Sequence, residues 1–324
     1  LRLASFLGLT RPRLQQNWLT LTDIRNLFRL AGFEIVRTQQ EVISPIWFPL
    51  VSFLLNRVLV KLPLFNHLAL TNVVVAKPVV SNDNTLPSVS VVVAARNEAG
   101  NMETLFRRLP SMGASTELVI VEGGSKDNTF EEMQRCASEF PHIPTTLLRQ
   151  KGKGKGDAVR LGFNHASGDI LMILDADLTV APEDLPRFFD AICRGRCEFA
   201  NGVRLVYPME SHAMRSANLI GNKFFSAAFS WLLGQPVRDT LCGTKVMWRS
   251  DYAKLAANRG YFGDFDPFGD FDLLFGAARL NLKIVDIPVR YHDRAYGDTN
   301  ISRWRHGLIL LRMVVFGGLK LKFV

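Results

Sequence analysis

Five short runs, most of them largely apolar, alternate with helix-like segments, and this alternation limits the folds open to the 324-residue chain more than any other feature. The runs are SVSVVVAAR, ELVIVEGG, TTLLRQ, DILMILDADL and FANGVRL, and the segments between them include ETLFRRLPSM, TFEEMQRCASEF and DAVRLGFNHA. A strand that is apolar on both faces needs cover on both faces. The pattern therefore predicts an α/β fold with a mixed, mostly parallel sheet and helices on either side. In such sheets, ligands bind beyond the carboxyl ends of the strands.

A polar, turn-rich stretch at residues 77–88, KPVVSNDNTLPS, separates this region from the residues before it. We predict a small α/β fragment at residues 1–80, a linker at 81–87 and the main domain at 88–324. Within the fragment, TLTDIRNLFRLAGF is typical of a capped helix that ends at Gly32, and EIVRTQQEVI and LTNVVVAKP are typical of strands.

Residues 18–78 resemble the C-terminal end of a class I S-adenosylmethionine-dependent methyltransferase, where a helix ending in AGF leads into a strand and a later strand finishes the sheet. The glycine-rich turn that would hold the cofactor in that family is absent from these residues. We therefore assign the fragment no activity and expect it to pack against the main domain.

The chain has a net charge of +9 and a pI of about 9.6. This excess of positive charge suggests an anionic partner. The charge alone does not distinguish among a phosphorylated substrate, a lipid surface and nucleic acid. Because the cations lie on predicted strand-end loops rather than along one helix or in an RNA-reading motif, we expect no nucleic acid partner.

The four cysteines are too few for a disulfide framework, and the pair Cys193 and Cys197 lacks the further ligands of a zinc site. We expect reduced thiols and a cytosolic setting. The opening LRLASFLGLTRPR lacks the order of a signal peptide, and a chain that begins with Leu is expected to be part of a longer one. Prolines, Arg57 and Lys61 interrupt the most apolar stretch, ISPIWFPLVSFLLNRVLVKLPLF, so no transmembrane helix is predicted.

The run DILMILDADL ends on two carboxylates, Asp175 and Asp177. Side chains two residues apart on an extended strand point to the same face, with Cα atoms roughly 6.5 Å apart, so the pair converges on one ligand if the segment stays extended. Left unpaired in a buried site, the two carboxylates would repel each other. A hard Mg²⁺ or Mn²⁺ ion removes the repulsion and completes its shell with water and phosphate oxygens. We predict a metal site here; the alternative is a pair of solvated loop acids.

Upstream of this strand, RQKGKGKGDAVRLGF places Lys151, Lys153 and Lys155 among glycines just before a predicted helix. Backbone amides exposed by glycine, a helix N-terminus and ammonium groups all favour a phosphate group. The loop is not a Walker A loop, which needs G-x-x-x-x-G-K-[ST]. A flexible basic surface loop is the alternative.

Polar groups also follow two other predicted strands. VVVAARNEAGN reaches Asn97 and Glu98, and LVIVEGGSKDNT ends in a turn that carries Glu122, Ser125 and Asp127. At neighbouring carboxyl ends of a parallel sheet, such groups are placed to bind a base and a ribose. Ordinary helix capping is the alternative.

Taken in order, these motifs resemble those of the inverting glycosyltransferases of family 2 with the GT-A fold, and among them the polyprenyl-phosphate sugar transferases such as dolichyl-phosphate mannosyltransferase. The resemblance spans residues 88 to about 322. The family motifs NE, GSxDxT, GKGxAxxxG and GDxxxxxDADL match the chain at Asn97–Glu98, Gly124–Thr129, Gly154–Gly162 and Gly168–Leu178. The resemblance implies a Rossmann-like GT-A sheet, Mg²⁺ or Mn²⁺, and a GDP- or UDP-linked sugar donor bound by Asn97, Glu98, Glu122, Ser125, Asp127, Lys155, Asp175 and Arg303.

Further along, a GxR motif at Arg204 and a second arginine, Arg215, match residues that meet the acceptor phosphate in family members, where guanidinium groups suit bidentate contacts. Routine surface charge is the alternative. DTLCGTK at 239–245 matches a D-x-x-x-G segment of the family. RAYGDTNISRWRHG matches the R-x-x-G-x-[ST] segment that closes over the diphosphate, where Arg294 and Arg303 are expected to act.

Two departures from the family pattern limit what the resemblance implies. Ala94 and Arg96 replace a Pro and a Tyr before NE, and Gly123 replaces a carboxylate that is often near the nucleobase, so the nucleotide remains open. ISRWR lacks the glutamine of the Q-x-x-R-W motif of processive synthases, so we expect a non-processive enzyme.

The expected reaction is attack by an acceptor oxygen on the anomeric carbon of a nucleotide-sugar, with inversion. The metal at Asp175 and Asp177, with Lys155, Arg294 and Arg303, would stabilise the departing diphosphate. Asp177 and Arg294 are therefore predicted catalytic residues.

A lipid phosphate acceptor is already anionic and needs no strong base, whereas a sugar hydroxyl would need Asp270 or Asp272 to remove its proton. Arg204 and Arg215 favour the polyprenyl phosphate. The alternatives are transfer to a glycan hydroxyl in cell-surface polysaccharide synthesis, with Asp272 as the catalytic base, a sugar nucleotidyltransferase, and a non-catalytic nucleotide-sugar-binding module.

The tail RWRHGLILLRMVVFGGLKLKFV alternates apolar blocks with basic residues such as Arg312 and Lys320. A basic, apolar segment suits an interfacial helix at an anionic membrane surface, although a core helix explains the same apolar residues. We expect a cytoplasmic protein that is peripheral at the cytoplasmic face of the membrane.

Overall fold

A seven-stranded sheet forms the centre of the molecule, with strands in the order β5-β4-β3-β6-β8-β7-β9. This computed structural model describes residues 19–79, 86–204, 216–261, 271–292, 294, 296 and 303–323, without the side chains of 216–220 and 303–306. The strands of the sheet are β3 Val89–Ala95, β4 Thr116–Glu122, β5 Thr145–Arg149, β6 Ile170–Asp175, β7 Phe199–Val203, β8 Lys245–Trp248 and β9 Ile284–Pro288.

Most neighbouring strands of this sheet are parallel, as the apolar runs predict. β3 pairs in parallel with β4 and β6, β4 with β5, and β7 with β9, while β8 runs antiparallel between β6 and β7. The sequence analysis did not predict β8 and β9. β8 is only four residues long and carries a buried lysine, Lys245, so it lacks the apolar run that marks the other central strands.

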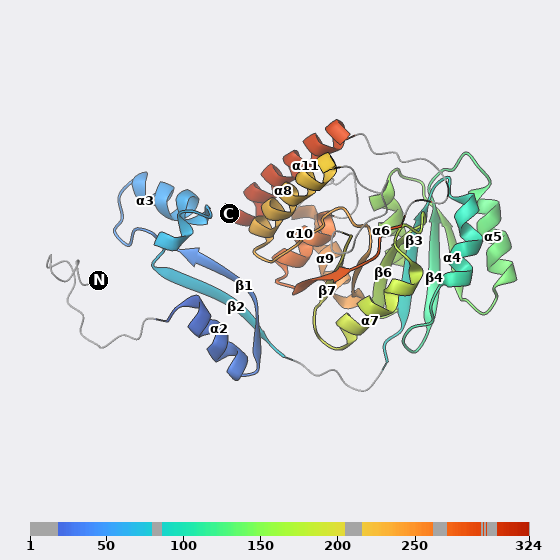
Figure 1. Ribbon diagram of the computed structural model, residues 1–324, viewed down its shortest axis with the longest axis horizontal. Coiled ribbons are helices and arrows are strands. Elements are labelled where there is room, and N and C mark those ends of the chain that lie inside the picture. The colour runs from blue at the N-terminus through green and yellow to red at the C-terminus, as the bar shows by residue number, and fades with distance from the viewer. Residues whose placement is uncertain are drawn as a thin grey trace.

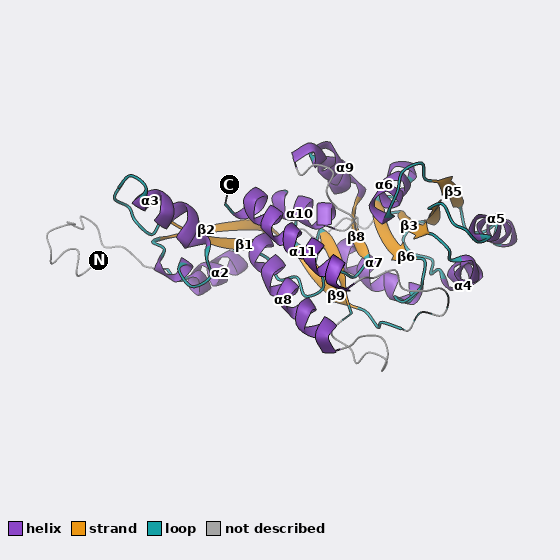
Figure 2. Cartoon of the chain, turned by 90° about the horizontal axis from the view of Figure 1, so that it is seen from above, coloured by secondary structure: helices purple, strands orange, loops and turns teal. Residues whose placement is uncertain are grey.

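Helices cover both faces of the sheet, as Figures 1 and 2 show. Val91 and Val93 of β3 pack on one face with side chains of α4, α5 and α7, whereas Val92 packs on the other face with α6, α8 and α10. The alternation places every β3 side chain from Val91 to Val93 in a core. The helices are α4 Met102–Arg108, α5 Thr129–Glu139, α6 Lys155–His165, α7 Leu185–Cys193, α8 Ser216–Leu233, α9 Arg249–Ala257, α10 Phe271–Arg279 and α11 Arg303–Gly317.

Residues 19–79 form a small unit at one end of the molecule (Figure 1). Strands β1 Phe33–Glu41 and β2 Thr71–Pro78 pair antiparallel beside α2 Leu21–Leu30, which begins with a capping box between Thr20 and Asp23. Gly32 follows the helix at φ +75°, as the predicted helix end requires. The segment between the strands holds α3 Val51–Phe53, a π-helical turn Leu54–Val58, and 3₁₀ turns Leu59–Lys61 and Asn66–Leu68.

This unit contacts the main domain through polar groups. The Trp231 indole N–H donates to the carbonyl of Lys61 at 2.8 Å, and Lys77 pairs with Glu198 at 2.6 Å. The last residues of the chain, the π-helical turn Gly318–Lys322 after α11, lie beside the unit (Figure 1). Residues 80–85 lie outside the described ranges, so the domain boundary stays a prediction. The likeness of residues 18–78 to a methyltransferase also stays a prediction.

In the described ranges, no helix combines the length and the apolar character that crossing a bilayer requires. All four cysteines are free, with Cys136, Cys197 and Cys242 buried and Cys193 half-buried. Burial raises the pKa of the Cys197 thiol to about 12, which makes it a poor nucleophile.

Gly162, the last glycine of the GKGxAxxxG motif, lets α6 approach the sheet. A Cβ at this position would collide with the Val92 side chain of β3 and contact Val121 of β4. We predict that Gly162→Ala lowers the free energy of unfolding by about 1–3 kcal/mol through overpacking. Chemical denaturation measures the change. Gly221→Ala in α8, where a Cβ meets open space, is the matched control and is expected to be neutral or stabilising.

Candidate active site

The carboxyl ends of β3, β4 and β6 lie side by side at one edge of the sheet. Ala94 of β3 is in register with Asp175 of β6, and Ala95 is in register with Glu122 of β4. The three polar strand ends found in the sequence therefore meet at one place, as a parallel sheet requires.

A cavity of about 860 Å³ opens at this edge. Its size suits a nucleotide-sized ligand. Five residues that the sequence analysis assigned to donor binding or catalysis line it: Asn97, Glu98, Asp127, Lys155 and Arg294. The structure thus brings together side chains from four segments that are far apart in the chain.

The loops after β3 and β4 are joined by hydrogen bonds that shape one wall of the cavity. Asn97 has a left-handed backbone, with φ +57°, and its N–H donates to the Ser125 hydroxyl at 3.0 Å. The Asn97 side chain accepts from the Lys126 N–H at 2.7 Å, and the Glu122 carboxylate accepts from the Ser125 N–H. Glu122 and Ser125 do not line the cavity. They hold the loops that do.

Asp127 lines the cavity while accepting hydrogen bonds from its own loop. Its carboxylate accepts from the Thr129 hydroxyl and N–H and from the Ala99 N–H. Slight burial would raise the pKa of Asp127, but these hydrogen bonds outweigh it and lower the pKa below the usual value. The Tyr296 hydroxyl lies 3.5 Å from the same carboxylate.

Asp175 ends β6 and forms an ion pair with Lys155, at 2.6 Å, from the first turn of α6. Burial works to raise the pKa of Asp175, but the Lys155 ammonium and the more distant Lys245 and Arg204 lower it overall. Asp175 is therefore ionised at neutral pH. Lys151 and Lys153 are exposed and do not line the cavity, so only one lysine of the predicted phosphate loop reaches it.

Asp177 lies in a turn. β6 ends at Asp175, and Leu178, which follows Asp177, has a left-handed backbone with φ +53°. The condition that the segment stays extended as far as Asp177 is therefore not met beyond Asp175. Thr179 caps the turn, donating its N–H and hydroxyl to one oxygen of Asp177 at 3.1 and 2.9 Å. The other oxygen accepts from the Arg294 guanidinium at 2.6 Å.

Glu98 and Asp177 share this arginine, since Arg294 also lies 3.4 Å from the Glu98 carboxylate. Burial raises the pKa of Glu98, and the charges of Asp177 and Asp127 add to this, only partly offset by Arg294 and the hydrogen bond from Asn101. The site therefore concentrates carboxylates that need cations.

These carboxylates fit a divalent metal that arrives together with a phosphate ligand. Asp175 and Asp177 offer hard oxygens of the kind Mg²⁺ and Mn²⁺ prefer. Within the part of the chain that the structure describes, no group of three or more His, Cys, Asp or Glu residues is placed to hold a metal. An ion here would take its remaining ligands from diphosphate oxygens and water, as Mg²⁺ commonly does.

Two predicted residues have protein partners instead of facing the cavity. Arg204 donates to both oxygens of the fully buried Asp239 at 2.7 and 2.9 Å. Asp272, on the buried helix α10, lies 3.3 Å from Arg259 and 4.0 Å from Arg160. Neither lines the cavity. The predictions for Arg215 and Asp270, and for the side chain of Arg303, fall outside the described residues.

Other cavity residues were not assigned to the site from the sequence: Arg96, Gly123, Lys126, Gln150 and Tyr296. Arg96 and Gly123 had been noted only as departures from the family pattern. A Cβ at Gly123 would lie 3.1 Å from the Gln150 side chain, so an amide from the neighbouring loop lies next to Gly123 in the cavity wall. Only the fold shows this contact, because Gly123 and Gln150 follow different strands.

Comparison with known proteins agrees with this geometry. The family model for glycosyl transferase family 2 matches residues 90–255, which is about half of the chain and spans the strand ends that carry the aspartates. The chain belongs to glycosyltransferase family 2.

Among curated relatives of this family 2 chain, the dolichol-phosphate mannosyltransferase of Pyrococcus furiosus is 39% identical over 120 residues, 36% of this chain and 33% of that protein. The undecaprenyl-phosphate 4-deoxy-4-formamido-L-arabinose transferase of Salmonella paratyphi B is 34% identical over 234 residues, 68% of this chain and 64% of that protein. The chain thus spans between a third and two thirds of the length of these relatives.

Among solved structures, glucosyl-3-phosphoglycerate synthase from Mycobacterium tuberculosis, in complex with Mn²⁺, UDP and glucosyl-3-phosphoglycerate, superposes with a TM-score of 0.52. The two sequences are 19% identical, and the superposed region covers 72% of this chain and 80% of the synthase chain. At this identity the likeness concerns the fold alone, and it agrees with the expected GT-A sheet.

Proposed function

We propose that this family 2 chain is a metal-dependent, non-processive enzyme that transfers a sugar, with inversion, from a nucleotide-sugar to a polyprenyl phosphate. The observation that carries the proposal is that two cations lining the cavity on the sheet edge, Lys155 and Arg294, each form an ion pair with an aspartate, Asp175 and Asp177 respectively. The printed names of the two relatives, a dolichol-phosphate and an undecaprenyl-phosphate transferase, support the acceptor class.

The chain's own residues account for donor binding. Lys155 and Arg294 line the cavity and would move from their carboxylate partners toward the diphosphate when a cation binds the aspartates. Arg96 and Lys126 are exposed, line the same cavity and have no acidic partner among the described residues, so they add positive potential for an anionic donor. Bound Mg²⁺ or Mn²⁺, held by Asp175 and Asp177, would supply further charge stabilisation for the leaving diphosphate.

The position of Asp272 favours a phosphate acceptor over a hydroxyl acceptor. A hydroxyl acceptor would need a base at the cavity, but Asp272 lies on a buried helix beside Arg160 and Arg259. A phosphate acceptor needs no such base. The role of Arg204 and Arg215 in binding the acceptor phosphate stays a prediction. Arg204 would have to bind the phosphate while it keeps its ion pair with Asp239.

We also propose that the chain works at the cytoplasmic face of a membrane, where polyprenyl phosphates reside. In α11 and the turn after it, Leu308, Leu311, Val315 and Leu319 are exposed and recur at helical spacing. Such an apolar stripe beside basic residues suits the membrane interface.

The deciding experiment is a donor panel of UDP- and GDP-linked hexoses with Mn²⁺ and a short polyprenyl phosphate. We expect one donor to yield a sugar-phosphate-polyprenyl product, detected by mass spectrometry. Chelation by EDTA should abolish transfer, and Mn²⁺ should restore it. Sugar found only on hydroxyl acceptors, or consumption of nucleoside triphosphate and sugar phosphate, would contradict the proposal.

Gly243 of the DTLCGTK segment provides a second test of the same site. A Cβ here would collide with both the Asp175 carboxylate and the Lys155 ammonium, so alanine has to displace the pair. We predict that Gly243→Ala lowers kcat/KM for transfer about 10–100-fold, as shifts of supporting groups around a metal site do. Gly260→Ala, where a Cβ meets open space, should retain full activity. Equal activities of the two variants would show that the Asp175–Lys155 geometry is not used.

A further inference from the structure

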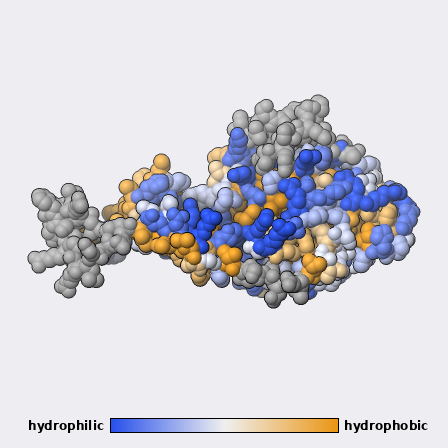
Figure 3. Space-filling view, turned by 60° about the horizontal axis from the view of Figure 1, so that its bottom comes forward, coloured by the Kyte–Doolittle hydropathy of each residue, from blue (hydrophilic) through white to orange (hydrophobic). Residues whose placement is uncertain are grey.

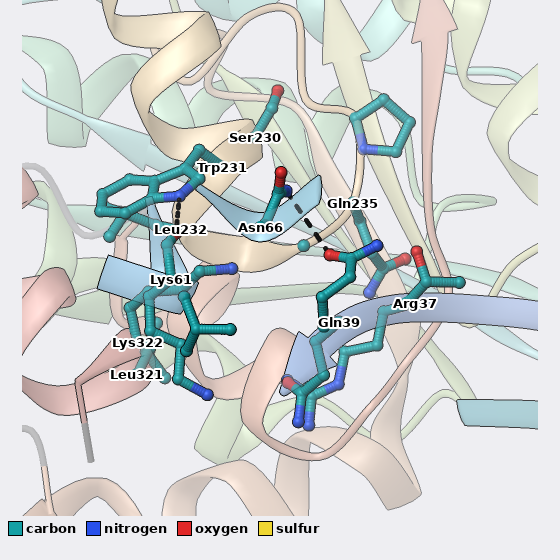
Figure 4. A pocket seen from close by; sticks show the side chains of 15 residues that line it. Arg37, Gln39, Lys61, Asn66, Ser230, Trp231, Leu232, Gln235, Leu321 and Lys322 are labelled. Atoms are coloured by element: carbon teal, nitrogen blue, oxygen red, sulfur yellow. Dashed lines mark hydrogen bonds between the residues drawn. The ribbon is translucent and has the colours of Figure 1, made fainter. Parts of the chain in front are cut away.

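A second cavity, of about 460 Å³, lies between the N-terminal unit and the main domain. Figure 4 shows Arg37 and Gln39 from β1, Lys61, Trp231 from α8 and Lys322 from the last turn of the chain around it. It shares no lining residue with the cavity at the strand ends. Cavities at domain interfaces are common ligand sites.

The lining of this cavity carries more positive than negative charge. Arg37, Lys61 and Lys322 are all half-buried there. Glu41 pairs with Lys61. Among the residues that the structure describes, neither Arg37 nor Lys322 has a carboxylate partner, and the buried Nε of Arg37 has no hydrogen-bond acceptor. Two cations therefore remain for an anionic ligand.

The protonation behaviour of these groups agrees with the geometry. Burial lowers the pKa of Lys322, and the neighbouring charges of Lys61 and Arg37 lower it further, against a smaller opposite effect of Glu41. Burial also lowers the pKa of Arg37. Lys322 lies 5.6 Å from the Trp231 ring, a cation–π contact that compensates only part of the repulsion. Keeping these cations together without an anion costs stability.

We propose that this cavity binds the phosphate group of a phosphate ester, with Arg37 and Lys322 as its main contacts. Guanidinium and ammonium groups are the usual partners of phosphate oxygens. Asn66 favours an ester over a bare phosphate ion, because its buried Oδ1 lacks a donor and would accept from a hydroxyl of the alcohol portion. The site goes beyond the proposed transferase activity and does not depend on it.

The ester can come from solution or from a lipid headgroup. Exposed apolar side chains of the N-terminal unit, among them Leu50, Val51, Phe53 and Leu54, precede the cavity residue Lys61 in the chain. Figure 3 shows apolar side chains gathered on the surface of this unit. The experiment therefore includes a soluble arm and a lipid arm.

In the soluble arm, calorimetric titration with glycerol phosphate is compared between the wild-type chain and Arg37→Gln and Lys322→Gln. We expect each substitution to weaken binding about tenfold or more. Without ligand, both variants should melt at the same temperature as wild type or higher, because a repulsion is removed. Lys322→Arg, which keeps the charge, should retain binding, and Arg194→Gln on the exposed end of α7 is the control for net charge.

In the lipid arm, co-sedimentation with vesicles of phosphatidylglycerol in phosphatidylcholine is compared with pure phosphatidylcholine. The site is assigned to a headgroup if the chain binds the phosphatidylglycerol vesicles, if Arg37→Gln and Lys322→Gln reduce this binding, and if the chain does not bind glycerol phosphate. Binding of glycerol phosphate alone assigns it to a soluble ester. The proposal is overturned if wild type binds neither ligand, if Arg194→Gln weakens binding as much, or if UDP with Mn²⁺ competes with glycerol phosphate.

Discussion

Replacing Asp177 by Asn is expected to lower the rate of sugar transfer about 10³-fold, the largest loss of activity we predict. The Asp177 carboxylate binds Arg294 at 2.6 Å, and Asp175 binds Lys155; both cations line the cavity. Asparagine keeps the size of the side chain but loses the charge, so Arg294 and the proposed metal would both lose a carboxylate ligand. Steady-state assays with the donor found by the panel measure the effect.

Asp169→Asn is the matched control, because it makes the same change at the other end of the same apolar run. Asp169 accepts hydrogen bonds from Ser88 and lies away from the cavity. We expect its activity to stay within a few-fold of wild type. If Asp177→Asn retains wild-type kcat at saturating Mn²⁺, the carboxylate is not a metal ligand and the proposed arrangement of the donor site is wrong.

Replacing Asp239 by Asn is expected to destabilise the fold by about 3–5 kcal/mol, the largest loss of stability we predict. Asp239 is fully buried and accepts from the Arg204 side chain at 2.7 and 2.9 Å and from the Leu241 N–H at 3.0 Å. Its removal leaves the partly buried Arg204 guanidinium without a counter-charge. Urea or guanidinium denaturation measures the change.

The exposed pair Arg108 and Glu183 is the control, since it has the same two-point geometry at 2.7 and 2.8 Å. Glu183→Gln should cost less than about 1 kcal/mol, because water screens this pair. Replacing Arg204 and Asp239 together by apolar residues should cost less than Asp239→Asn alone. An Asp239→Asn protein as stable as wild type would show that Arg204 is not held by this charge.

The effect of Asp239 depends on pH with a defined sign. Burial opposes its ionisation, but Arg204 and the backbone N–H groups hold the pKa of Asp239 below its ordinary value of 3.8. A depressed carboxyl pKa stabilises the folded state above the unfolded pKa and ceases to do so as pH falls through the folded pKa. The stability difference between wild type and Asp239→Asn should therefore be constant from neutral pH to about pH 4 and shrink below it.

Several parts of the site follow from local sequence. The apolar runs determine where strands form, because a strand covered on both faces needs apolar side chains throughout. Since parallel strands end at a common edge, the polar residues after each run were expected to meet, and Asn97, Glu98, Asp127, Lys155 and Arg294 do line one cavity. The predictions for the strand ends needed only spacing and the general geometry of parallel sheets, whereas Arg294 was assigned through the resemblance to family 2.

Other parts depend on contacts between segments far apart in the chain. Arg204 and Asp239 are 35 residues apart and meet only because β7 and the DTLCGTK segment are neighbours in the fold. The same holds for Asp177 and Arg294, 117 residues apart. Local sequence offers no signal for such pairs, since a charged side chain on a loop looks the same whether it faces solvent, substrate or an opposite charge.

The sequence by itself therefore determined five of the seven strands, their helical cover and the edge at which a ligand is expected, because these depend on hydrophobic periodicity and chain direction. Only the tertiary structure decided which cation each carboxylate binds, that Asp177 leaves the strand in a turn, and that Arg37 and Lys322 share a cavity with Lys61. Electrostatic partners are set by distances of a few ångströms across the packed core, and packing fixes those distances only after the elements have assembled.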